Sequence, residues 1–204
     1  TARFSAVTTP INATLIDYLA ASVGELGVNV RLRSEASADE IEAASFDAVV
    51  VATGAHRGRP PIPGAELDHV LTGDDLRMML TGGNGAALRG LSTGQRFAVK
   101  AAQRLHLTTP ERVRGLSKRW MPLGDNIVIV GGGLVGVEIA EFLAQRGRHV
   151  TVLEQGPDLG VEMAHPRRWR TLHQAREDNV TFVTGASVDV IDEKAVRYTV
   201  DDAA

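Results

Sequence analysis

The 204-residue sequence contains no cysteine. This chain therefore carries no redox dithiol, no cysteine nucleophile, no thiolate zinc site and no cysteine-ligated iron–sulfur cluster. The six histidines are scattered, without an H-x-x-x-H pair or a carboxylate at metal-ligand spacing. We expect no metal site, and any electrons that the chain handles must travel on bound organic cofactors.

The sequence also lacks long apolar runs and a marked excess of one charge. No run approaches the roughly 20 apolar residues that span a bilayer, and the first ten residues, TARFSAVTTP, do not resemble a secretory signal. The net charge of −3 predicts no general affinity for nucleic acid or anionic membranes. With 44% hydrophobic and 23% charged residues, the composition is that of a globular protein of one or two domains. A cytoplasmic location is the default expectation.

The most specific pattern lies between residues 126 and 154, where an apolar run, a glycine turn, a helix, a second apolar run and an acid follow one another. Three glycines stand in G-x-G-x-x-G register, which suits a tight turn, close approach to a pyrophosphate and close packing of helix on strand. The phosphates would lie at the helix N-terminus, where unpaired N–H groups and the helix dipole stabilise negative charge. The predicted dinucleotide site comprises Gly131, Gly132, Gly133, Leu134, Val135, Gly136 and Glu154.

Glu154 lies eighteen residues after Gly136, near the roughly 20 expected of the acid that binds the ribose hydroxyls. Its carboxylate favours NAD(H) over NADP(H), because a 2′-phosphate would face a like charge. Two interpretations of Glu138 stay open: a carboxylate favoured by the helix dipole, or a polar group near the nicotinamide. The glycines could also form only a turn in a βαβ unit that binds nothing.

The flanking pattern predicts an α/β fold with a Rossmann-like parallel sheet. The run 127–130 is apolar throughout and 150–153 is apolar except for Thr151, which is typical of strands buried on both faces. Helices are expected at 11–26, 39–44, 74–80 and 165–178, strands at 28–32, 46–52 and 180–183, and a hairpin at 187–191 and 195–200.

Two segments of the sequence are rich in basic residues. Residues 86–121 are predicted to form two helices divided near Pro110, with eight cations against one acid, Glu111. They could bind a coenzyme phosphate, dock another domain, or form a solvated helix face. In the helix from residue 165, Arg167, Arg168 and Arg170 oppose the helix dipole. A carboxylate from a missing domain or a cofactor phosphate would compensate for them.

These residues together carry a family resemblance. GGGLVGVEIAEFLAQRG with VTVLE resembles the NAD(P)-binding domain of the pyridine nucleotide–disulfide oxidoreductase superfamily, and FDAVVVATGAHRGRPPIPG resembles the segment that leaves its FAD domain. LGVEMAHPRRWRTLHQAREDNV is similar to the old-yellow-enzyme-like reductases, the group of 2,4-dienoyl-CoA reductase, 2-enoate reductase and trimethylamine dehydrogenase.

The resemblance implies a part of a larger flavin-dependent oxidoreductase. It implies an incomplete FAD-type α/β segment over residues 1–66, a helical linker over 67–124 and an NAD(P)-binding domain over 125–204. It adds Ala52, Thr53 and Gly54 as flavin-side residues, in a pocket that holds FAD or only ADP. Hydride would pass from NADH to FAD, then on to FMN and an enoyl-type substrate.

The expected partners follow from the same resemblance. They are an N-terminal barrel domain with FMN and an iron–sulfur cluster, and the remaining FAD-domain segments, all outside this chain; a homo-oligomer is left open. The first residue is Thr1 rather than methionine, which agrees with a fragment that is inactive alone. No catalytic residue is assigned.

Two alternatives accompany this interpretation. One is a non-catalytic module that binds a nucleotide as a structural or regulatory ligand. The other is that residues 131–136 bind FAD. It is disfavoured because the A-T-G segment precedes the glycines, whereas a lone FAD domain would have the reverse order.

Overall fold

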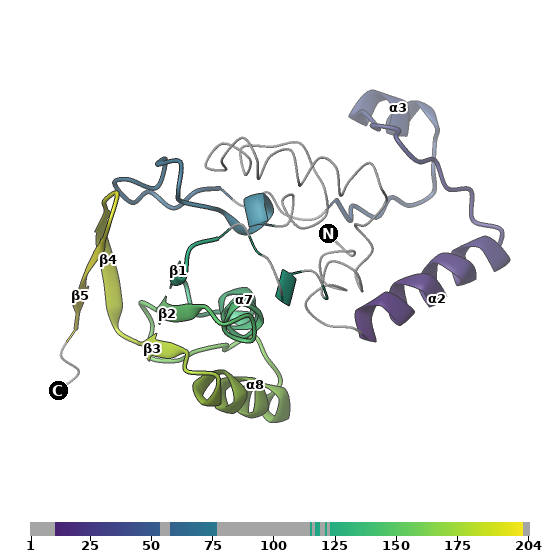
Figure 1. The fold of residues 1–204 in the computed structure, drawn as a ribbon. Helices are drawn as coiled ribbons and strands as arrows, with labels where there is room; N and C mark the ends of the chain where they lie inside the picture. Colours follow the sequence, from purple (N-terminus) through teal and green to yellow (C-terminus); the bar gives the residue numbers. More distant parts are fainter. Residues whose placement is uncertain are drawn as a thin grey trace. The chain divides into compact units, whose positions relative to one another are not determined.

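The computed structural model describes residues 11–53, 58–76, 115, 117–118, 121 and 123–201. The chain divides into two compact units, one of residues 14–58 and the other of residues 59–204 together with 1–13. Figure 1 labels the helices and strands of both units. Most of the linker expected at 67–124 lies outside the described residues, so the boundaries at 66 and 124 stay a prediction.

The unit that begins at residue 59 is built on a three-stranded parallel sheet in the order β1-β2-β3. The strands are β1 (Asn126–Val130), β2 (His149–Leu153) and β3 (Thr181–Val183). Val128 pairs with Thr151, which in turn pairs with Thr181 on the other side. The expected Rossmann-like α/β fold is therefore confirmed.

Two helices complete the parallel unit. Helix α7 (Leu134–Ala144) connects β1 to β2, and α8 (His165–Glu177) connects β2 to β3. Both lie on the same side of the strands in Figure 1. Proline occupies the first turn of α8, as predicted, where its missing N–H leaves no backbone bond unmade.

The core lies between these helices and the sheet. Val137 and Ala140 of α7, Val152 of β2 and Ala175 of α8 are completely excluded from solvent. Apolar residues at helical spacing on α7 pack here against the apolar residues of β2, so the same contact buries both patterns.

The two apolar strand sequences differ in burial, which corrects one expectation. β2, in the middle of the sheet, buries Val150, Val152 and Leu153, whereas Val128 and Val130 of β1 are 43% and 42% exposed. β1 pairs only with β2 among the described residues, and only one of its faces meets the core. Burial on both faces was therefore right for β2 and wrong for β1.

A separate antiparallel hairpin follows, of β4 (Ala186–Ile191) and β5 (Val196–Val200), as the sequence predicted. The loop from residue 59 docks on its end, because the Ile191 N–H donates to the Pro63 carbonyl at 2.9 Å. Within that loop, the guanidinium of Arg59 pairs with Asp75 at 3.4 Å. The proline-rich segment is thus an ordered strap on the hairpin.

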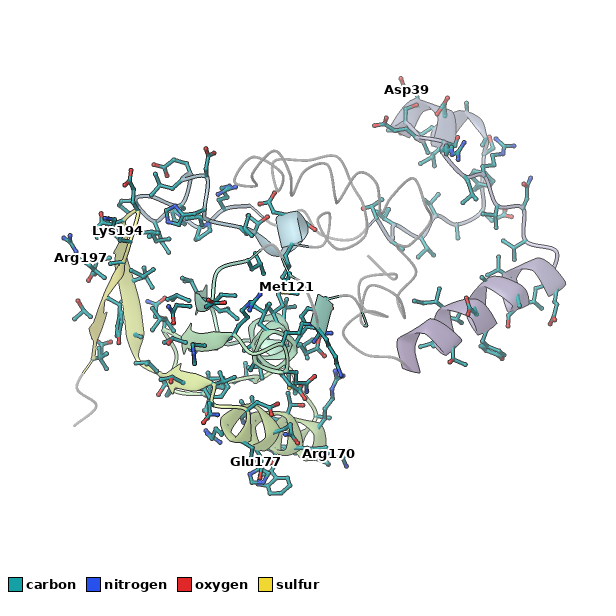
Figure 2. The ribbon with its side chains drawn as sticks, in the orientation of Figure 1. Asp39, Met121, Arg170, Glu177, Lys194 and Arg197 are labelled. Carbon is teal, nitrogen blue, oxygen red and sulfur yellow. The ribbon has the colours of Figure 1, made fainter. Side chains whose placement is uncertain are left out.

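Two isolated residues before β1 also pack on the parallel unit. Ser117 accepts a hydrogen bond of 2.9 Å from Nε of Arg146, whose guanidinium lies over the ring of Phe142. Met121 is buried against the core, and Figure 2 shows it beside α7. Residues from outside the βαβ unit therefore also pack around the end of α7.

The unit of residues 14–58 contains helices but no strands among its described residues. α2 spans Ile11–Glu25, of which residues 14–25 belong to this unit, and α3 spans Ala38–Ala43; both lie close to their expected bounds. The strands predicted at 28–32 and 46–52 do not form. A strand requires a hydrogen-bonded neighbour, and these segments pair with none of the described residues, so those two predictions were wrong.

Some expectations fall on residues that the structure does not describe. They are Gly54, most of the helix predicted at 74–80 and nearly all of the basic segment 86–121. Of the helix at 74–80, the first residues are helical, and the Thr72 hydroxyl caps them by accepting from the Asp75 N–H at 3.1 Å. Within the described residues, no helix has the length and apolar character needed to cross a membrane.

Candidate functional site

The glycine turn joins β1 to α7 at the carboxyl end of the sheet. Gly131 has a φ of +104°, a backbone conformation that side-chain-bearing residues rarely adopt. Its N–H donates to the carbonyl of Leu153 at 2.8 Å, which ties the turn to the end of β2. The turn is therefore positioned where ligands bind in open α/β sheets.

Gly136 permits the close packing that the motif predicts. A Cβ at this position would lie 1.9 Å from the carbonyl oxygen of Gly131, far closer than two non-bonded heavy atoms can approach. The first turn of α7 therefore lies directly on the preceding turn, and a larger residue would push the helix away from it.

The N-terminus of α7 presents backbone donors to this turn. The helix begins after Gly133, which makes no side-chain cap, and Val137 is the first residue whose N–H bonds back, to the Gly133 carbonyl at 3.1 Å. Among the described residues, the N–H groups of Val135 and Gly136 have no acceptor. These unpaired donors at the positive end of the helix dipole form an anion-binding position.

Glu154 is brought to the same turn. One carboxylate oxygen accepts from the Gly132 N–H at 2.5 Å and the other from the Gly156 N–H at 2.8 Å. The backbone of Glu154 is held as well, since its N–H donates to the Val183 carbonyl at 2.9 Å. Each carboxylate oxygen has two lone pairs, so each keeps acceptor capacity for a ribose hydroxyl.

The loop after Glu154, residues 155–164, folds back over the glycine turn. The Gly160 N–H donates to the Gly132 carbonyl at 2.7 Å, and the buried side chain of Leu159 would lie 2.5 Å from a Cβ on Gly132. Glu162 reaches the start of α7, where its carboxylate accepts from the Leu134 N–H at 2.8 Å. Hydrogen bonds from its own N–H and from Leu134 lower the pKa of the Glu162 carboxyl.

Nothing in the sequence pointed to Glu162 as a site residue. It belongs to no motif, and its approach to α7 depends on the path of a loop that has no regular structure. The only signal available was indirect: an uncapped helix N-terminus behind a glycine leaves donors that some acceptor has to meet.

Two of the arginines at the start of α8 have partners within the chain. Arg167 forms an ion pair with Glu138, and Arg168 pairs with Asp158 at 2.8 Å and donates to the Leu159 carbonyl at 2.6 Å. Neither expected partner, a missing domain or a cofactor phosphate, is needed for them. Arg170 forms no ion pair with the described residues, and in Figure 2 it points away from the strands.

Glu138 therefore serves α8 through its pair with Arg167. It also acts on the next turn of α7, because burial, followed by the charges of Asp178 and Glu138, raises the pKa of the Glu141 carboxyl. A role near the nicotinamide stays a prediction.

The predicted residues fall in two places. All seven at the glycine turn, including Glu154, come together in one unit. Ala52 and Thr53 lie in the other unit, where they are exposed, and Gly54 is outside the described residues. The flavin-side role of those three stays a prediction.

A comparison with known protein families identifies the chain. Residues 16–203 match the family described as pyridine nucleotide-disulphide oxidoreductase. The chain belongs to this family. Membership implies binding of NAD(P)H and FAD.

The individual relatives have low sequence identity to this chain and are much longer. The chain is 28% identical to a bilirubin reductase of Mediterraneibacter gnavus over 88% of its length, and 28% identical to an NADH oxidase of Thermoanaerobacter brockii over 86%. It covers only 22% and 21% of those two proteins. The chain thus spans about a fifth of the length of the curated relatives it matches.

The fold agrees with a solved structure. A 2-naphthoyl-CoA reductase in complex with 2-naphthoyl-CoA matches 98% of this chain with a TM-score of 0.68 and 22% identity, over 24% of that protein. At this identity the similarity concerns the fold alone.

Proposed function

We propose that this chain is the NADH-binding part of a larger flavin-dependent oxidoreductase. When bound, NADH supplies hydride for a flavin, and parts of the protein outside this chain pass the electrons to FMN and an enoyl-type substrate. The observation that carries the proposal is the convergence of the Gly131 turn, the open donors of α7 and the Glu154 carboxylate at one edge of a parallel sheet.

The residues fit the dinucleotide in three ways. The N–H groups of Val135 and Gly136 would hold the pyrophosphate. The absence of a side chain at Gly133 leaves room at the start of α7 for an anionic oxygen, and the Glu162 carboxylate occupies that room in this structure. Glu154, fixed by two backbone N–H groups, would accept from the ribose hydroxyls.

The acid also favours NADH over NADPH. A 2′-phosphate would approach a carboxylate that already uses one lone pair of each oxygen on backbone donors, and like charges at about 4 Å repel by several kcal/mol near a protein surface. The neighbouring Arg168 does not offset this repulsion, because it is paired with Asp158.

The family resemblance supports the finer parts of the proposal. These are the old-yellow-enzyme-like group, the iron–sulfur cluster and FMN of a barrel domain, and FAD or ADP near Ala52–Gly54. The names of the relatives differ in substrate, bilirubin in one and NADH in another, so they support a shared nucleotide-binding part more than any one acceptor.

Replacement of the acid tests the ribose role. Glu154→Ala should weaken NADH binding about tenfold, the effect of losing one charge-assisted hydrogen bond, and should narrow the preference for NADH over NADPH. Glu154→Gln keeps an acceptor for the Gly132 N–H and separates loss of charge from loss of shape. Titration of both coenzymes by fluorescence measures the ratio.

The control is Glu177→Gln on the outer side of α8, where the Glu177 side chain is 58% exposed and points away from the strands (Figure 2). It removes the same charge and should leave both affinities unchanged. An unaltered coenzyme preference in Glu154→Ala would count against the ribose role. The non-catalytic alternative has a separate test: NADH should bleach the flavin absorbance of the purified flavin-containing protein, whereas a purely structural nucleotide site would leave the flavin oxidised.

A further inference from the structure

The start of α7 already holds one anion, and it comes from the chain itself. The carboxylate of Glu162 accepts the Leu134 N–H at 2.8 Å, and its other oxygen lies 2.9 Å from the position that a Cβ of Gly133 would take. Leu134 and the two residues after it are the three whose N–H groups begin the helix without an intrahelical partner. Glu162 therefore occupies the Leu134 N–H, directly beside the Val135 and Gly136 donors proposed for the pyrophosphate.

Carboxylate and phosphate are interchangeable at such a position. Both are favoured by the unpaired donors and by the positive end of the helix dipole. They exclude each other, however, because two anions at one helix start repel and the Leu134 N–H makes one good hydrogen bond. A pyrophosphate seated across the first turn of α7 would thus compete with Glu162.

The Glu162 side chain can leave the start of α7 while the backbone of the loop stays in place. Buried side chains anchor the loop on both sides of it, Leu159 with 5% and Met163 with 6% exposure. Backbone bonds of Gly160 and Met163 fix the same path. Glu162 itself is exposed, so a change of side-chain rotamer alone would carry its carboxylate into solvent.

We propose that Glu162 is an intramolecular latch, a carboxylate that occupies the pyrophosphate position of the free protein and has to be released when the dinucleotide binds. This inference rests on the proposed NADH-binding function. The latch satisfies the helix N-terminus in the absence of coenzyme and reduces the apparent affinity by the fraction of molecules in which it is closed.

Affinity measurements on Glu162 variants test the latch in the full chain. Glu162→Gln and Glu162→Ala should each bind NADH more tightly, by about fivefold, the scale of one helix-capping interaction. Glu193→Gln is the matched control: it removes one exposed carboxylate from the hairpin turn, next to the Lys194 labelled in Figure 2, and should leave the affinity unchanged. Adenosine, which lacks phosphate, should bind the unaltered chain and the Glu162 variants equally.

A ligand-free measurement gives a second readout. In the NMR spectrum of the free protein, the Leu134 amide should shift between the unaltered chain and Glu162→Gln. With saturating NADH the two proteins should give the same Leu134 amide position, because the carboxylate has left.

Each result decides between the two proposals. If the unaltered chain bound NADH and both Glu162 variants bound it equally well or more weakly, the latch would be overturned. The NADH site itself would still stand. Tighter binding of adenosine as well would also overturn it, since the effect would not depend on phosphate. Failure of every protein, unaltered chain included, to bind NADH would overturn both.

Discussion

Valine side chains differ in burial between the two units of this chain. Val152, in the middle of the parallel sheet, is completely buried, whereas Val50, in a run of the same apolar character, is 88% exposed. Both lie in segments that the sequence predicted as strands. The difference is pairing: β2 has a hydrogen-bonded neighbour on each side, and residues 46–52 have none among the described residues.

An apolar run therefore indicates that its side chains favour burial, but it does not identify the neighbouring strand that would bury them. In the unit that contains the glycine turn, the partners are close in sequence, because each βαβ connection returns the chain to the same sheet within about 30 residues. In residues 14–58, the apolar side chains of the two predicted strands stay exposed, Leu32 and Val51 at 82% and 80%. The local sequence was therefore sufficient to predict the strands of the first unit but not those of the second.

The largest expected effect comes from the closest contact in the unit that contains the parallel sheet. Gly136→Ala places a methyl group 1.9 Å from the Gly131 carbonyl oxygen, and backbone atoms cannot move aside as a flexible side chain can. We expect a loss of about 2–3 kcal/mol in the free energy of unfolding, typical of overpacking, and loss of measurable NADH binding. Urea denaturation and coenzyme titration measure the two effects.

The other unit offers a matched glycine. Gly24 lies in α2 with no atom near the position of an added Cβ, so Gly24→Ala should stabilise its helix by up to about 1 kcal/mol. If Gly136→Ala folded and bound NADH as well as the unaltered protein, the close packing of α7 on the glycine turn would be wrong.

The valine comparison itself predicts the next largest effect. Val152→Ala removes two buried methyl groups from the core and should cost about 2 kcal/mol, including the cavity left behind. Val50→Ala should change stability by less than about 0.5 kcal/mol, as exposed substitutions usually do. Equal losses in the two variants would mean that residues 46–52 are buried in the folded protein, and the contrast between the units would disappear.

The smallest expected effect concerns charge. Glu141 on α7 is half-buried, and burial, Asp178 and Glu138 raise the pKa of its carboxyl. The ionised form is thus disfavoured in the folded state, and Glu141→Gln should raise the melting temperature slightly at pH 7. Solvent screening keeps the gain below about 1 kcal/mol.

The pH dependence of that gain has a defined sign. Above the raised pKa of the folded state the unaltered protein carries the full penalty, and the penalty disappears as the pH falls through that pKa toward the ordinary value of 4.5. The advantage of Glu141→Gln should therefore shrink on acidification. Glu42→Gln, on the exposed surface of α3, is the control. An advantage that grew on acidification would contradict the assigned direction.

The glycine turn was predictable because its determinants are local. The φ of Gly131 and the close approach at Gly136 follow from a turn between one strand and the next helix. Glu154 needed only the length of a βα connection, and the structure places its carboxylate on the Gly132 N–H. Helix α8 and the hairpin after it were also predicted within a few residues.

The partners of charged side chains were not predictable in the same way. Arg167 meets Glu138 and Arg168 meets Asp158, and each pair depends on how the loop 155–164 places α8 against α7. Spacing along one helix could state only that the arginines needed compensation. The choice between a domain, a phosphate and a carboxylate of this chain required the fold.

The sequence alone determined the βαβ unit, its glycine turn and the acid at the end of β2, because hydrophobic period, glycine spacing and connection length are properties of neighbouring residues. Tertiary structure decided the rest. It determined which apolar runs found a hydrogen-bonded neighbour, and it brought Glu162 from an irregular loop to the start of α7. Both outcomes depend on contacts between segments whose separation in sequence carries no information about their distance in space.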